Sequence, residues 1–337
     1  MGEAGARRTS KIGLLIGLAV SVLALVAVVR WAGWRPVIAA LAQIEPIYLL
    51  LAFGVFLLSM LARAVAWWLL LTRSVSLGRT LATLNEGYLL NNVLPWRLGE
   101  LGRAVLLGRQ PGMSTLRVLS TIVIERTYDI ILGTTLLLAL LPVVLQLSWA
   151  SRAAAIWAGA VVLAVVGLWL LVHYAGAIEG WIGRRFAHPQ TWQARWRALH
   201  AGLAALENPS LLIGSFGALA LSWLLAGVDY WLVLRSLHPA PGWSWAYLML
   251  AATALGGAVP AAPGSIGVFE AAAVAALGAF GVAPGTALAA ALVLHAMVYL
   301  TTLGIGGVAL LRDGDTLQGL YQDVLGWLSR RQQVETP

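Results

Sequence analysis

Long apolar runs separated by short polar breaks dominate the pattern of the chain. Six of the runs approach or exceed the roughly 20 residues that a helix needs to cross a bilayer. They are residues 12–29, 46–71, 114–147, 153–174, 209–234 and 286–311. This pattern predicts an all-α polytopic membrane protein in which residues 1–337 form a single membrane domain.

Two further apolar regions, residues 80–107 and 245–280, are interrupted near their middle. The first break is Asn91–Arg103 and the second is Val259–Gly267, and both carry proline and glycine. Backbone that is broken at membrane depth is tolerated only where protein or water covers its free polar groups. We therefore expect two re-entrant helical hairpins, each of them a candidate site.

Three shorter segments, residues 34–44, 178–207 and 315–331, are amphipathic or rich in tryptophan and arginine. They are expected to be interfacial helices on the membrane surface. The apolar residues of the last segment recur at helical spacing. They are Leu317, Leu320, Tyr321, Val324, Leu325 and Leu328.

An internal repeat relates residues 46–147 to residues 209–311, with residues 153–174 as a linking helix. A shift of 163 residues aligns Pro46, Phe53, Gly54, Ser59 and Trp68 with Pro209, Phe216, Gly217, Ser222 and Trp231. A shift of 165 residues aligns Pro95, Gly99 and Gly102 with Pro260, Gly264 and Gly267. Because three spans separate the copies, they should form an inverted repeat, in which paired broken helices indicate a transporter's binding site. A duplication kept for structure alone is the alternative.

Charge orients the predicted spans. The chain is 60% hydrophobic and 11% charged, its net charge is +8, and Lys11 is its only lysine. With six spans and two hairpins, sixteen of the 22 cationic residues lie on the face that holds both termini. Four lie on the other face and two, Arg63 and Arg126, lie within spans. The positive-inside rule then predicts cytoplasmic termini in the cytoplasmic (inner) membrane, and it explains most of these arginines.

Several function classes are excluded by what the sequence lacks. The chain has no cysteine, which removes disulfides, thiol catalysis and cysteine metal sites. No nucleotide-binding loop, zinc motif or catalytic-triad spacing is present. The arginines have no soluble domain to carry them, which argues against nucleic-acid binding. We expect no catalytic residue, no metal and no cofactor, and therefore not an enzyme.

Ionisable side chains inside the predicted spans are the first candidates for a site, because they are costly there unless they face a cavity or a partner. Glu125 and Asp129 are four residues apart and share a helix face, and Arg126 can pair with Asp129. They form either a lining that binds a polar group or an internal salt bridge. Arg63 has no acidic neighbour on its own helix. Its partner is Glu100, Glu125, Asp129 or an anionic ligand.

The first break adds polar residues to this set. Arg97 and Arg103 flank its turn, where the free N–H groups of the following half-helix also favour a phosphate. The alternative is that both arginines reach the cytoplasmic surface. Asn91 and Asn92 bind headgroup oxygens or satisfy the broken backbone. The predicted headgroup-binding residues are Arg63, Asn91, Asn92, Arg97, Glu100, Arg103, Glu125, Arg126 and Asp129.

The second half offers fewer polar residues, so a headgroup is expected to contact mainly the first hairpin. Asp229 and His295 could form a proton relay, or His295 could be a packing residue. The predicted cavity or gating residues of this half are Asp229, Pro260, Pro263, Gly264, Ser265, Glu270, His295 and Tyr299.

These motifs together resemble the transmembrane region of lysylphosphatidylglycerol synthetases, also described as a flippase-like membrane protein family. The matching elements are Asn92-x2-Pro95-x3-Gly99-Glu100-x2-Arg103, Glu125-Arg126-x2-Asp129 and Pro260-x2-Pro263-Gly264-Ser265-Ile266-Gly267-Val268-Phe269-Glu270. The resemblance covers the chain from about Ala39 to Leu311. It implies an inner-membrane protein that moves lipids, such as aminoacylated phosphatidylglycerol or polyprenyl-linked glycans, between leaflets. Two-domain members also carry a cytoplasmic aminoacyltransferase domain, which we do not expect in this standalone chain.

We therefore expect lipid translocation in a bacterial or archaeal cytoplasmic membrane, with the headgroup of a phospholipid or polyprenyl-linked lipid crossing between the two hairpins. The absence of an ATP-binding motif means that movement is down a gradient or coupled to ions. One alternative is a small-solute or ion secondary transporter. Another is a non-catalytic membrane partner of a separate lipid synthase or glycosyltransferase. The sequence is also compatible with a homo-oligomer.

Overall fold

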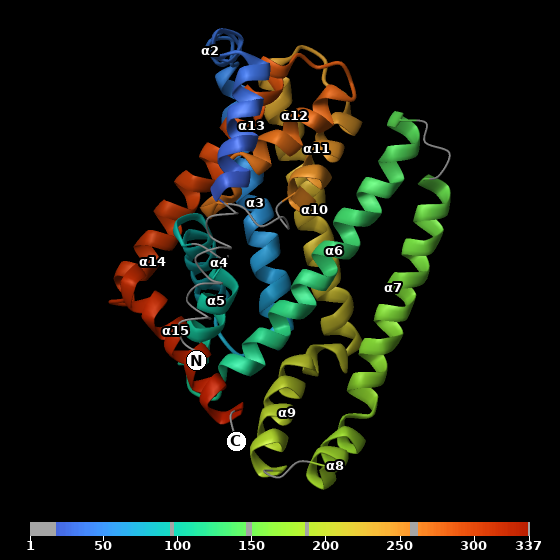
Figure 1. Cartoon of the computed structure of the whole chain (residues 1–337), viewed down its shortest axis with the longest axis vertical. Coiled ribbons are helices and arrows are strands. Elements are labelled where there is room, and N and C mark those ends of the chain that lie inside the picture. Colours follow the sequence, from blue (N-terminus) through green and yellow to red (C-terminus); the bar gives the residue numbers. More distant parts are fainter. Residues whose placement is uncertain (1–17, 95–97, 146–149, 186–188, 257–261, 336–337) are drawn as a thin grey trace.

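The structure, a computed structural model, describes residues 18–94, 98–145, 150–185, 189–256 and 262–335. Within these ranges every regular element is a helix (Figure 1), as the apolar pattern predicts. The first part of the chain forms the helix Leu18–Ala32, α2 (Trp34–Ala42), α3 (Pro46–Leu70), α4 (Leu77–Val93), α5 (Gly99–Gly108), α6 (Thr115–Leu145), α7 (Ala150–His173), α8 (Ala175–Arg185) and α9 (Pro189–Leu203). The second part forms α10 (Pro209–Leu237), α11 (Trp243–Gly256), α12 (Val268–Gly278), α13 (Pro284–Thr301), α14 (Gly307–Arg312) and α15 (Leu317–Glu335).

Three helical stretches of the described chain are long and apolar enough to cross a membrane. They are α3, α10 and the stretch Pro284–Arg312, in which a π-helical turn, Thr302–Gly306, joins α13 to α14. The helix Leu18–Ala32 and α2 meet at a bend of 74° and could together form a fourth span. The chain is thus a helical membrane protein, whereas its six-span count and re-entrant hairpins stay predictions.

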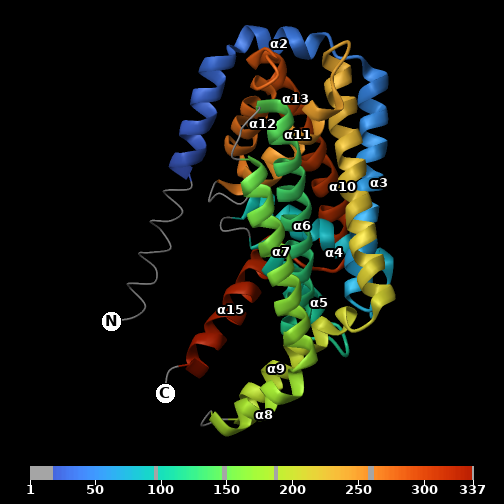
Figure 2. The ribbon, with the colours of Figure 1, turned by 90° about the vertical axis from the view of Figure 1, so that its right-hand side faces the viewer.

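Helices α3 and α10 run antiparallel and pack along most of their length (Figure 2). At one end, the Glu45 backbone N–H donates to the Ser236 carbonyl over 3.0 Å. Near the middle, the Ser59 hydroxyl lies 2.9 Å from the carbonyl oxygen of Ser222 and 3.1 Å from its hydroxyl. Ser59 and Ser222 are the pair that the 163-residue shift aligns, so this contact is what a two-fold axis between the helices would give.

The same correspondence holds at the ends of these helices. The Trp68 indole donates to the Val75 carbonyl over 2.8 Å, and the Trp231 indole donates to the Pro241 carbonyl over 3.0 Å. In both cases the tryptophan ties its helix to the loop that follows. The repeat thus aligns residues that make equivalent contacts, although the inverted repeat itself stays a prediction.

The two interrupted regions form helical hairpins, α4–α5 and α11–α12, whose four helices are each too short to cross a membrane alone. The hairpins lie toward opposite ends of the molecule's long axis (Figures 1 and 2). Hairpin α4–α5 packs against the π-helical turn, whereas α11 packs against α6. Each hairpin therefore contacts a helix from the other half of the chain.

Glycines allow α4 and α5 to approach closely. A Cβ atom added at Gly99 would lie 2.0 Å from the Gly87 carbonyl oxygen and 2.6 Å from the Asn91 side chain. One added at Gly87 would lie 2.4 Å from the Arg103 side chain. Small residues at helix interfaces in membranes serve this purpose, since they let backbones come together.

Gly99→Ala is therefore expected to destabilise the hairpin by about 1–3 kcal/mol, the usual cost of overpacking a tight interface. Thermal unfolding of the purified protein in detergent measures the loss. Gly78→Ala, at the start of the same hairpin, is the matched control because a Cβ there meets nothing within 4 Å. If both variants melt at the same temperature as wild type, the close approach of α4 and α5 is incorrect.

The C-terminal helix α15 packs on the first hairpin through part of its apolar face. Leu320 and Val324 are fully buried in clusters with residues of α4 and α5, whereas Leu325 is exposed. Ion pairs reinforce this packing. Arg79 pairs with Asp313, and Arg109 pairs with Asp323 and, over 2.8 Å, with Asp315. The helical periodicity of the tail was correct, and the first hairpin is the partner of the buried part of its apolar face. The position of α15 on the membrane surface stays a prediction.

Candidate functional site

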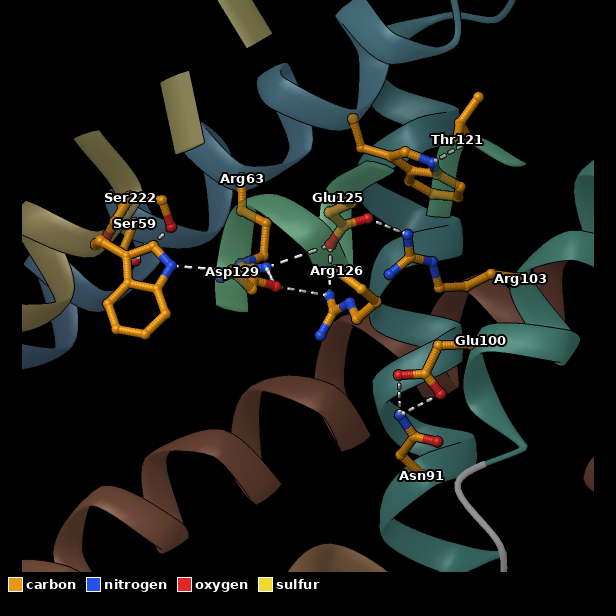
Figure 3. Close-up of polar contacts among 12 residues, drawn as sticks. Ser59, Arg63, Asn91, Glu100, Arg103, Thr121, Glu125, Arg126, Asp129 and Ser222 are labelled. Carbon is orange, nitrogen blue, oxygen red and sulfur yellow. Dashed lines mark hydrogen bonds and ion pairs between the residues drawn. The ribbon is translucent and has the colours of Figure 1, made fainter. Parts of the chain in front are cut away.

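A cluster of charged side chains joins α3, α5 and α6 in the interior of the protein (Figure 3). Its centre is Glu125 on α6, whose side chain is completely buried. The Glu125 carboxylate accepts hydrogen bonds from Arg103 over 2.5 Å, from Arg126 over 2.6 Å and from Arg63 over 3.2 Å. Three guanidinium groups from three helices thus share one buried carboxylate, which is the strongest kind of hydrogen bonding available to them.

Asp129, one turn further along α6, completes the cluster. It binds Arg63 through both carboxylate oxygens, at 2.9 Å and 2.8 Å, and lies 3.2 Å from Arg126. It also accepts a hydrogen bond from the Trp223 indole of α10 over 2.9 Å. The predictions that Glu125 and Asp129 share a face and that Arg63 finds its partner on another helix are both confirmed.

Arg103 is buried, with only 2% of its side chain exposed. Its guanidinium carbon lies 4.0 Å from the ring centre of Trp67, and the Trp67 indole donates to Thr121 over 3.1 Å. The alternative that this arginine reaches the cytoplasmic surface is therefore wrong. Trp67 and Trp223 were not predicted from the sequence. Trp67 could have been, because it lies four residues after Arg63 and therefore shares its helix face.

The cluster carries an excess of positive charge. Arg63, Arg103 and Arg126 face only two carboxylates, so the five ionised side chains have a net charge of +1. Arg126 is the most accessible of the three arginines, with 38% of its side chain exposed. Both of its ion pairs use Nη2, and no described residue accepts a hydrogen bond from its Nη1. An anion that reaches the cluster would therefore meet Arg126.

The asparagines of the first break contact neighbouring segments and not the arginine cluster. Asn91 accepts a hydrogen bond from the Gly99 N–H over 2.8 Å, and its amide lies 3.4 Å from Glu100. Asn92 donates to Thr302, in the π-helical turn, over 3.0 Å. Glu100 is therefore the partner of Asn91 and not of Arg63. Arg97, also expected at this site, lies outside the described residues.

A cavity of about 250 Å³ lies beside the cluster, between the two halves of the chain. Arg63 belongs to both the cluster and the cavity wall, and Tyr88 of α4 lies beside it on that wall. Ser59 and Ser222, the pair aligned by the repeat, also line it, as does Asp229. The remaining lining is mostly apolar and comes from α3, α10, α11, α12 and α13. The cavity thus offers a few fixed polar groups in an apolar surround, as ligand sites commonly do.

His295 pairs with Glu270 and not with Asp229, so the alternative of a relay between Asp229 and His295 is wrong. Its Nδ1 lies 2.5 Å from the Glu270 carboxylate, and its Nε2 lies 2.9 Å from the Gly264 carbonyl oxygen. Glu270 also accepts from the Gly267 N–H over 2.6 Å, at the start of α12. These three contacts hold the turn of the second hairpin.

Other predicted residues of the second half belong to the same turn. Gly264, at φ 69°, is packed so closely that an added Cβ would lie 1.9 Å from the Tyr299 hydroxyl. Pro263 begins the short helical turn that continues through Gly264 to Ser265. Pro260 lies outside the described residues. Among the second-half residues that were predicted for the cavity and that the structure describes, only Asp229 is in its wall.

Comparison with known proteins gives one result. The family model for the transmembrane region of lysylphosphatidylglycerol synthases matches residues 14–306 of the chain. No curated protein and no solved structure matches it.

Proposed function

Because the chain belongs to the family of lysylphosphatidylglycerol synthase transmembrane regions, we propose that it moves an anionic lipid between the leaflets of the cytoplasmic membrane. The family relates the chain to lipid metabolism in a membrane. The arginine cluster on Glu125 and Asp129, with its net positive charge beside a cavity between the two halves, is the observation that carries the proposal.

The chemistry of the cluster favours a phosphate-containing headgroup. Arginine's planar fork matches phosphate oxygens, and Arg126 keeps Nη1 available on a half-exposed side chain. Glu125 and Asp129 hold the three arginines in place before a ligand arrives, so no side chain has to be ordered on binding. Because three arginines face two carboxylates, the cluster keeps a net positive charge that attracts an anion. A cluster with equal numbers of arginines and carboxylates would be neutral and would not.

The position of the cavity supports movement of the headgroup across the membrane. Helices α3 and α10 meet at Ser59 and Ser222, and the two hairpins lie toward opposite ends of the molecule. Rocking of one half against the other would expose the cavity to each side in turn, as in transporters built from inverted halves. The headgroup would occupy the cavity beside Ser59, Arg63 and Ser222 while the acyl chains stay in lipid.

Headgroup preference in reconstituted liposomes tests this proposal. We expect wild type to move fluorescent phosphatidylglycerol at least about tenfold faster than phosphatidylcholine. Both headgroups carry a phosphate, but the quaternary ammonium of phosphatidylcholine would lie against the net positive charge of the cluster, and juxtaposed like charges cost several kcal/mol. Exposure of the label to a membrane-impermeant quencher measures the rate. Empty liposomes are the control.

Free glycerol phosphate, added to the same liposomes, separates the alternatives. Its uptake without lipid movement would instead indicate a small-solute transporter. If neither lipid nor solute moves, the chain does not act as a transporter by itself, and the role of a membrane partner for a synthase gains support.

A further inference from the structure

Asp229 is a buried carboxyl group in the cavity wall that has no role in the proposed binding of an anionic headgroup. It lies on α10, 2% of its surface is exposed, and it belongs to the lining of the cavity beside Arg63. Its Oδ1 is buried and has no hydrogen-bond partner among the described residues. No ion pair within the described chain reaches it either.

The other buried carboxylates of the described interior each have an ionic partner. Glu125 and Asp129 bind arginines, and Glu270 binds His295 and the Gly267 N–H. Glu86 accepts no hydrogen bond among the described residues, but it lies 3.7 Å from Arg79. Asp229 differs in having no ion pair within the described chain, and an ionised carboxylate without a partner is very costly in such surroundings.

Arg63 is too far away to compensate Asp229. Ser59 and Ser222 lie opposite each other on the antiparallel helices. Arg63 is one turn beyond Ser59, and Asp229 is two turns beyond Ser222 in the opposite direction along the axis. With a rise of 1.5 Å per residue, their backbones are about 16 Å apart along the helices, beyond the reach of a salt bridge. Arg63 is in any case held by Glu125 and Asp129.

The neighbouring elements supply no other ionic partner. The cavity wall adds Tyr88 from α4 and Tyr230 from α10 itself, whereas its residues from α11, α12 and α13 are apolar. Other titratable and charged side chains lie near the cavity wall on helices that pack against α10. Each of those described next has a partner other than Asp229. On α11 the Tyr247 hydroxyl donates to the Leu224 carbonyl, and on α13 His295 binds Glu270. On α6, Glu125, Arg126 and Asp129 belong to the cluster, and Arg117 at the start of the helix donates to Ser74.

We propose that Asp229 is a proton-binding site that couples lipid movement to the proton gradient. The inference rests on the proposed function. When the cavity is closed around a headgroup, the carboxyl group carries a proton and is neutral. When the cavity opens to the side of lower proton activity, the O–H bond breaks, the proton leaves to water and a hydrated carboxylate remains. The emptied cavity, with water around the carboxylate, then turns to the other side, where a proton taken from water restores the neutral group, so each cycle moves one proton.

The experiment compares wild type with Asp229→Asn in liposomes that contain fluorescent phosphatidylglycerol, with and without an imposed pH gradient. A tenfold difference in proton activity can change the wild-type rate by up to about tenfold, and in Asp229→Asn the ratio of the two rates should fall to about one. Ser222→Ala, which alters the same cavity without removing a titratable group, is the matched control and should keep the wild-type ratio.

A second measurement reads the protonation state without any transport. The infrared difference spectrum between wild type and Asp229→Asn should contain the carbonyl band of a protonated carboxyl group at neutral pH. If that band is missing, or if Asp229→Asn responds to the gradient as wild type does, the inference is wrong while lipid movement stands. Asp229→Asn could instead change the headgroup preference and still respond to the pH gradient as wild type does. That result would overturn the proton-binding role and indicate that Asp229 contacts a cationic headgroup. If no lipid moves under any condition, it is the proposed function that fails.

Discussion

Replacing Glu125 by glutamine is expected to reduce stability more than any other single substitution in the cluster. The neutral amide cannot balance Arg63, Arg103 and Arg126, and Arg103 is too deeply buried to find water instead. Breaking a buried pair by removing one partner typically costs about 3–5 kcal/mol. We expect the unfolding temperature of the purified protein to fall by about 5 °C or more, measured by intrinsic tryptophan fluorescence in detergent.

Glu179→Gln provides the matched control for this change. Glu179 of α8 lies 3.5 Å from Arg197 of α9, but 35% and 65% of the two side chains are exposed. Such surface pairs contribute only about 0–1 kcal/mol. If Glu125→Gln melts as close to wild type as Glu179→Gln does, the central carboxylate does not hold the arginines as described.

The apolar pattern predicted an all-helical chain with two interrupted regions. The runs that begin at Pro46 and Pro209 became α3 and α10, with proline in the first turn, where its missing N–H costs nothing. The repeat aligned Ser59 with Ser222, and the structure brings these two side chains together. Hydrophobic periodicity predicts a helix because the pattern lies within one segment. The alignment of the repeat needs only that segment and its copy.

The partners of individual side chains could not be predicted in the same way. Asp229 and His295 are both intramembrane ionisable residues, yet the turn at Gly264 brings Glu270 to His295 and leaves Asp229 in the cavity. Which residue meets which depends on the rotation of each helix and on how the hairpins dock. Neither is encoded in local periodicity.

Burial was the second quantity that the sequence did not reveal. Arg103 follows a polar break and was compatible with the cytoplasmic surface, but α5 packs so closely on α4 that its guanidinium is enclosed by Trp67 and Glu125. The glycines at positions 87 and 99 allow that approach. The tail shows the same limitation, since its spacing predicted an apolar face but not that α5 covers part of it.

Arg126→Ala is expected to have the largest effect on lipid movement. It removes the half-exposed guanidinium, and the ionised side chains left in the cluster have no net charge. Glu125 keeps Arg63 and Arg103, so the variant should still fold. Loss of a charge-assisted contact worth about 1.5–3 kcal/mol corresponds to a rate of phosphatidylglycerol translocation at least about tenfold lower. Arg126→Lys, which keeps the charge but not the planar fork, should recover part of the rate.

The role of the arginine cluster in lipid movement is tested by the rate of phosphatidylglycerol translocation in liposomes for wild type, Arg126→Ala and Arg197→Ala. Arg197 is the control because 65% of its side chain is exposed and it lies on α9, outside the cluster. We expect translocation by wild type, the same rate for Arg197→Ala, and a rate at least about tenfold lower for Arg126→Ala. Translocation by Arg126→Ala at the wild-type rate, or none by folded wild type, would contradict that role.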